Sequence, residues 1–80
     1  MNYQTLSISQ LARLISKDWA KVNYAAVPYL AAMRELETVD SSFDKDDGRQ
    51  VVGYFLSNAS SWRGDTAKAI KAELKRRLGR

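Results

Sequence analysis

Apolar residues recur every three or four positions along the first quarter of the chain, and this spacing restricts the fold most strongly. They are Ile8, Leu11, Ala12, Ile15, Trp19 and Val22. Because an α-helix completes a turn in about 3.6 residues, such spacing places all of them on one helical face. Ser7 stands directly before the series, and serine is a favoured N-cap residue. The pattern predicts a helix over residues 8–22.

The same spacing predicts three further helices, over residues 26–38, 47–58 and 65–78. Pro28 fits only the first turn of the second helix, because its ring clashes with the carbonyl four residues earlier. Asp46 or Asp47 is suited to cap the third helix. For the fourth, Gly64 favours a late start with Asp65 as the N-cap.

Residues 50–56 leave an alternative open. The β-branched pair Val51 and Val52 and the aromatic residues that follow also suit a strand. A single strand would have no partner elsewhere in the sequence, so a helix is favoured. The polar stretch 40–47 before it is interpreted as a turn-rich loop, with Phe43 anchoring the loop to the core.

With 80 residues, of which 45% are hydrophobic, the chain has the size and composition of one folded domain. The sequence therefore predicts an all-α fold over residues 1–80, a compact single domain built as a bundle of about four short helices. The residues expected to share a core are Leu11, Ile15, Trp19, Leu30, Met33, Phe55, Leu56, Ile70 and Leu74.

Two absent residue types exclude most site chemistry. The chain has neither cysteine nor histidine, which removes disulfides, thiolate nucleophiles, the commonest general base and the usual zinc ligands. The acidic stretch 40–48 lacks the glycine and glutamate positions of a calcium loop. The glycines are too far apart in the sequence to cradle a phosphate. We therefore expect no enzyme activity, no cofactor and no metal site.

The sequence also carries no membrane or export signal that we recognise. No apolar run approaches the ~20 residues that a membrane span needs. Residues 1–5 lack the basic and apolar regions of a signal peptide. These features predict a cytoplasmic protein with no membrane partner.

The positive charge is concentrated towards the C-terminal end. Residues 61–80 carry seven Lys and Arg against Asp65 and Glu73, a net charge of +5, whereas residues 1–60 carry a net charge of −1. Such asymmetry makes a nucleic-acid site a candidate. The residues that would bind nucleic acid are Arg63, Lys68, Lys71, Lys75 and Arg76. The competing interpretation, favoured on composition alone, is a solvated helix face in which Glu73 and Arg77 form an i,i+4 pair.

A second candidate site precedes the fourth helix. Trp62, Arg63 and Asp65 surround Gly64 there, and tryptophan and arginine are residue types that often anchor protein interfaces. In this hypothesis, Arg63 pairs with a carboxylate or phosphate of the partner, and Trp62 supplies apolar area. The alternative is that Trp62 belongs to the core, because a small domain needs its large aromatic residues there, and that Arg63 is only exposed.

Two stretches of the chain are distinctive: residues 26–30, Ala-Val-Pro-Tyr-Leu, and residues 54–67, Tyr-Phe-Leu-Ser-Asn-Ala-Ser-Ser-Trp-Arg-Gly-Asp-Thr-Ala. Together they resemble a group of small bacterial proteins of unknown function that are associated with phages, plasmids or integrated elements. The resemblance brings no catalytic residues. It implies a bacterial cytoplasmic protein and favours a role in handling DNA or in modulating a host protein.

These observations favour a non-enzymatic protein-interaction module, an accessory protein of a mobile element, with a protein partner that the sequence does not identify. The alternative is a nucleic-acid-binding protein that uses the basic C-terminal helix. Either function is compatible with a homodimer, since short helices often bury leftover apolar surface against a second copy.

Overall fold

The computed structural model describes residues 3–40, 42–43 and 46–79, and the side chains of residues 42, 43 and 46 lie outside that description. Its elements are η1 (Tyr3–Thr5), α1 (Ile8–Asp18), α2 (Val27–Met33), β1 (Ser42–Phe43), β2 (Asp46–Asp47), α3 (Gly48–Ser57) and α4 (Asp65–Arg77). The four helices in the described part of the chain confirm the predicted all-α bundle.

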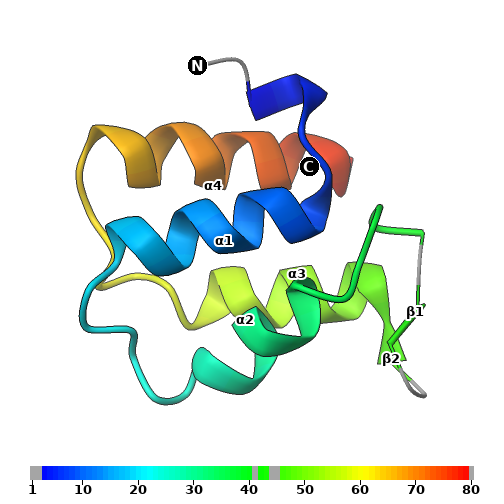
Figure 1. The fold of residues 1–80 in the computed structure, drawn as a ribbon, viewed down its shortest axis with the longest axis horizontal. Helices are drawn as coiled ribbons and strands as arrows, with labels where there is room; N and C mark the ends of the chain where they lie inside the picture. Colours follow the sequence, from blue (N-terminus) through cyan, green and yellow to red (C-terminus); the bar gives the residue numbers. More distant parts are fainter. Residues whose placement is uncertain (1–2, 41, 44–45, 80) are drawn as a thin grey trace.

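The helices are arranged around α1, which lies beside α4 on one side and α2 on the other, and α2 packs in turn against α3 (Figure 1). The short η1 segment lies against the last turns of α4, so the two ends of the described chain are close together. None of the described helices has the length and apolar content needed to cross a membrane.

A capping box starts α1 at the predicted position. The Ser7 hydroxyl oxygen accepts a hydrogen bond from the backbone N–H of Gln10 (3.1 Å), and the Gln10 side-chain oxygen accepts one from the backbone N–H of Ser7 (2.8 Å). Each bond satisfies a backbone donor that has no partner within the helix. The Ser7 cap therefore contributes directly to the stability of α1.

We expect Ser7→Ala to lower the free energy of unfolding by about 1 kcal/mol, the usual cost of losing a serine cap. Ser60→Ala, in an exposed turn, is the control and should stay within about 0.5 kcal/mol of the parent protein. Urea denaturation measures both. Equal stabilities of the two variants would contradict the assigned role of Ser7.

The first helix ends at Asp18, four residues before the predicted end at Val22. The N–H of Trp19 still donates to the carbonyl of Ile15 (2.8 Å), but the backbone of Trp19 has left helical angles, with φ −93° and ψ 87°. This change of direction lets the chain turn towards α2 while the Trp19 ring stays in the core. The prediction was wrong here because tertiary packing ended the helix before its apolar spacing did.

The turn after α1 is tied to the end of α3. The Asn23 side-chain amide donates to the carbonyl of Asn58 (3.2 Å), and its oxygen accepts from the N–H of Ala25 (3.2 Å). Val22 packs against the core from this turn. Its apolar spacing therefore reflects burial, but not membership of the helix.

The second helix is shorter than the predicted span of residues 26–38. The carbonyls of Leu36 and Glu37, beyond its end, accept hydrogen bonds from the N–H groups of Ser9 (2.8 Å) and Ile8 (3.0 Å) in the first turn of α1. Inside a helix, these carbonyls would instead accept from N–H groups four residues later in the same segment. Residues 36 and 37 therefore do not continue α2. The predicted end was wrong because the hydrogen bonds between this segment and α1 depend on the tertiary structure, which apolar spacing does not show.

Residues 50–56 form a helix, as favoured over the strand alternative. The Asp47 carboxylate caps α3 by accepting from the N–H of Arg49 (2.9 Å). Within the stretch predicted to be a loop, β1 and β2 form a two-residue antiparallel ladder that pairs Ser42 with Asp47 and Phe43 with Asp46. The predicted anchoring by the Phe43 side chain lies outside the described residues.

The fourth helix begins with Asp65 as its first residue, so the N-cap is Gly64 and the prediction of an Asp65 cap was wrong by one residue. Gly64 has φ +113°, a backbone conformation that residues with a Cβ rarely adopt. Gly64 is the last residue of the loop that reverses the chain between α3 and α4 (Figure 1).

An aromatic cluster forms the centre of the core. The Trp19 and Trp62 rings stack, with centroids 5.9 Å apart, and the Phe55 ring lies edge-on to both, at 6.2 and 6.4 Å. Eight of the nine predicted core residues are buried, whereas Leu56 is only partly buried at the edge of the core. Leu56 falls on the flank of the apolar face of α3.

Candidate functional site

A basic groove runs along α4, from Asp65 to Lys75, and along the loop that enters the helix. It encloses about 580 Å³, is open to solvent, and is lined by Trp62, Arg63, Gly64, Asp65, Lys68, Lys71, Ala72 and Lys75. Four of these residues carry a positive charge and one carries a negative charge. The groove thus brings together most residues of the two sites predicted from sequence, which were treated there as alternatives.

Helical spacing and one glycine place the charges in this groove. Lys68, Lys71 and Lys75 follow one another at intervals of three and four residues, so they share one side of α4. The turn at Gly64 brings Arg63 to the same groove from the preceding loop. Gly64 and Ala72 have little or no side chain, which leaves the space between the long basic side chains open.

Lys71 is the one groove cation whose position is fixed by contacts with the core. Its Nζ donates to the carbonyl oxygen of Trp62 (2.5 Å) and lies 5.7 Å from the centroid of the Trp62 ring. Burial lowers the pKa of Lys71 below its usual value, and the neighbouring charges of Lys75 and Arg63 lower it further. Lys71 therefore forms part of the groove floor.

Arg63, Lys68 and Lys75 are exposed around that floor. Among the residues that the structure describes, no carboxylate forms an ion pair with any of the four groove cations. The side-chain N–H groups of Arg63, Lys68 and Lys75 are therefore available to a ligand, whereas Lys71 already donates to Trp62. Positive charge and several donors in one open groove can bind an anion.

Trp62 does not supply apolar area to a partner in the way that the interaction hypothesis required. Only 2% of the residue is exposed, its ring stacks on Trp19, and its Nε1 donates to the Asp18 carboxylate (2.8 Å). Burial of the ring agrees with the alternative interpretation of Trp62 as a core residue. Arg63 and Asp65 remain exposed, and their role in binding a partner stays a prediction.

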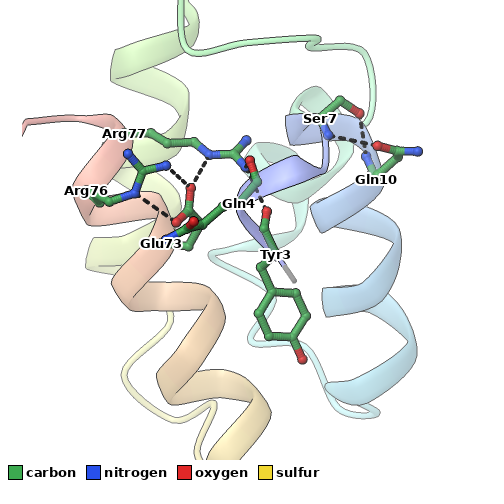
Figure 2. Close-up of polar contacts among 7 residues, drawn as sticks. All are labelled: Tyr3, Gln4, Ser7, Gln10, Glu73, Arg76 and Arg77. Atoms are coloured by element: carbon green, nitrogen blue, oxygen red, sulfur yellow. Dashed lines mark hydrogen bonds and ion pairs between the residues drawn. The ribbon is translucent and has the colours of Figure 1, made fainter. Parts of the chain in front are cut away.

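Arg76, predicted with the lysines as a nucleic-acid-binding residue, does not line the groove, and its role in binding stays a prediction. It projects from another side of α4, where its Nε and Nη2 atoms donate to the two carboxylate oxygens of Glu73 (2.9 and 2.6 Å) (Figure 2). The carboxylate of Glu73 therefore neutralises the positive charge of Arg76. Its position three residues from Glu73 was the available sequence signal.

Glu73 also holds Arg77 and, through it, the N-terminal segment. The Nε of Arg77 donates to Glu73 (2.6 Å), which confirms the predicted i,i+4 pair, and its Nη2 donates to the carbonyl of Tyr3 (2.8 Å) (Figure 2). Glu73 is only 6% exposed. Hydrogen bonding from Arg76, followed by that from Arg77, holds the pKa of Glu73 below its usual value although burial opposes this shift.

Among the described residues, no three His, Cys, Asp or Glu side chains gather as metal ligands. Comparisons with protein-family models, with curated proteins and with solved structures found no match for the chain. The fold and the groove together define the class: a small all-α protein with a basic surface groove.

Proposed function

We propose that the chain is a non-enzymatic binding module whose basic groove holds an anionic macromolecular partner. The observation that carries the proposal is the convergence of Arg63, Lys68, Lys71 and Lys75 on one groove that contains a single carboxylate, Asp65. The groove therefore has a local excess of positive charge, which attracts anions and raises their local concentration.

A comparison with the ion pairs elsewhere on the molecule supports this assignment. Arg49 pairs with Asp40 at 3.1 Å, and Arg76 and Arg77 pair with Glu73 at 2.6 Å. Arg49, Arg76 and Arg77 thus have carboxylate partners, whereas in the groove the charges of Lys75 and Arg63 repel that of Lys71. An anion in the groove would relieve that repulsion, which also lowers the pKa of Lys71.

A protein-interaction module is the second candidate, because Arg63 and Asp65 are exposed at the entry to α4 and an acidic segment of a protein could pair with the same cations. An accessory role in a mobile element rests only on the resemblance of residues 26–30 and 54–67. Both remain proposals that share the groove as the binding surface.

Replacing Arg63 and Lys68 together by alanine should weaken binding to any polyanion without unfolding the protein, because both side chains are exposed. The measurement is the salt concentration at which each variant elutes from immobilised heparin, a polyanion of neither candidate class. We expect the groove variant to elute at clearly lower salt than the parent protein, with an unchanged melting temperature.

The matched control replaces Arg13 and Lys17, which are exposed on α1 and do not line the groove. Arg13→Ala with Lys17→Ala removes the same amount of charge, so net charge alone would shift both variants equally. Equal elution of the groove variant and this control would mean that the groove is not the anion-binding surface, and the proposal would fail.

A further inference from the structure

We infer that the anionic partner is the phosphodiester backbone of a nucleic acid, bound without recognition of base sequence. This inference rests on the proposed function and assigns the chemical class of its ligand. Four properties of the groove support it: the type of its cations, its lack of an apolar anchor, the spacing of its lysines and its lack of groups that read or stack on bases.

The composition of the groove is unlike that of a protein-binding surface. Protein interfaces are depleted of lysine and depend on aromatic and other large anchors that enter or form pockets. Three of the four groove cations are lysines, and the one aromatic lining residue, Trp62, is 2% exposed. An acidic protein segment would find charge here, but it would find no apolar anchor. Phosphates need only charge and N–H donors.

The spacing of the lysines fits a polymer of phosphates. Lys68 and Lys75 are seven residues apart on α4, and a rise of about 1.5 Å per residue separates them by about 10 Å along the helix axis. One strand of a duplex carries a phosphate about every 3.4 Å of its axis. Lys68, Lys71 and Lys75 therefore form a row about 10 Å long that can contact more than one phosphate of such a strand, and Arg63 extends the row beyond the helix.

The groove offers little that could read or stack on bases. Side-chain amides, which read adenine, are absent from its lining, and the lysines and Arg63, which can donate to guanine, donate equally well to phosphates of any sequence. Stacking of unpaired bases requires an exposed aromatic ring, and the Trp62 ring is covered by Trp19 and Lys71. Binding should therefore follow charge density, which places duplexes at or above single strands in affinity.

The test measures fluorescence anisotropy of labelled ligands at about 50 mM salt and above, where binding through phosphates weakens steeply with salt. The ligands are two 20-base-pair duplexes of unrelated sequence, a 20-nucleotide single strand and polyglutamate of similar charge. We expect the two duplexes to bind within about threefold of each other. Contacts with three or four phosphates predict a slope of log K against log salt of about −3 to −4 on the duplexes.

Charge reversal at the exposed ends of the lysine row locates the contacts. Lys68→Glu with Lys75→Glu should weaken duplex binding at least about tenfold and reduce the salt slope by about two. The control is Arg13→Glu with Lys17→Glu, which changes the net charge equally on the outer face of α1 and should stay within about threefold of the parent protein. Lys71 is left intact because it contacts Trp62.

A melting curve checks that each variant is folded, and Lys68→Ala with Lys75→Ala replaces the reversal pair if that pair is not. Polyglutamate binding as tight as duplex binding would overturn the inference and leave the proposed function standing. A preference of more than about tenfold for one duplex, or equal weakening by the control pair, would also overturn it. Failure to bind heparin, polyglutamate and both nucleic acids at low salt would defeat the proposed function as well.

Discussion

Trp62→Ala is expected to lower the free energy of unfolding by about 3–5 kcal/mol, the usual cost of removing a large buried aromatic side chain. The ring stacks on Trp19, meets the edge of Phe55 and donates through Nε1 to Asp18. Alanine would leave a cavity between these groups and remove the partner of the Asp18 carboxylate. Because small domains have total stabilities of only about 5–15 kcal/mol, the loss should be large enough to change the folded population.

Chemical denaturation followed by far-ultraviolet circular dichroism measures this change without depending on tryptophan fluorescence. Tyr24→Ala is the matched control, because Tyr24 is also a large aromatic residue but is 88% exposed. It should change the stability by less than about 0.5 kcal/mol. A loss of less than about 1 kcal/mol in Trp62→Ala would contradict the assignment of Trp62 to the core.

Glu73→Gln is expected to lower the free energy of unfolding by about 1–3 kcal/mol, since a buried, hydrogen-bonded charge pair loses one partner. The expected loss comes mainly from the contact with Arg77, which is 15% exposed, because solvent screens the more exposed Arg76. Urea denaturation at neutral pH measures the loss. Glu35→Gln, on an exposed carboxylate, is the control. Equal effects of the two variants would contradict a structural role for Glu73.

The same carboxylate gives the protein a dependence on pH with a definite sign. Hydrogen bonds from Arg76 and Arg77 keep the folded-state pKa of Glu73 below its ordinary value of 4.5. The stabilisation is therefore fully present above that ordinary value and is lost as the pH falls through the lowered folded-state pKa. Stability measured between neutral pH and acid should show this loss in the parent protein. A Glu73→Gln variant with an equally steep acid loss would contradict it.

Apolar spacing predicted where the helices lie, because each helix must bury one face whatever surrounds it. It did not predict where α1 and α2 end. Trp19 leaves the helix to keep its ring in the core, and the carbonyls of Leu36 and Glu37 turn to cap α1. Both helix ends depend on contacts with residues distant in the sequence. The apolar spacing within one segment carries no information about those contacts.

The sequence predicted which segment of the chain carries the candidate site, but not which of its residues line one groove. The net charge of residues 61–80 indicated the basic end, and the spacing of Lys68, Lys71 and Lys75 indicated a shared side of the helix. Arg76, also a candidate for binding nucleic acid, does not line the groove and instead pairs with the buried Glu73. Arg63 reaches the groove of the lysines through the turn at Gly64, which has a positive φ. The only sign of this turn in the sequence is the glycine itself.

Trp62 contributes to both the core and the groove, since its ring lies in the aromatic cluster while its carbonyl accepts a hydrogen bond from Lys71 on the groove floor. An unfolded chain carries the same charges but has no fixed arrangement of them. A ligand that requires the assembled groove therefore binds only folded molecules and shifts the folding equilibrium towards them. At a free ligand concentration one hundred times Kd, this mass action would stabilise the native state by about 2.7 kcal/mol. For a small domain with a modest free energy of unfolding, a bound partner would therefore raise the fraction of molecules that are folded.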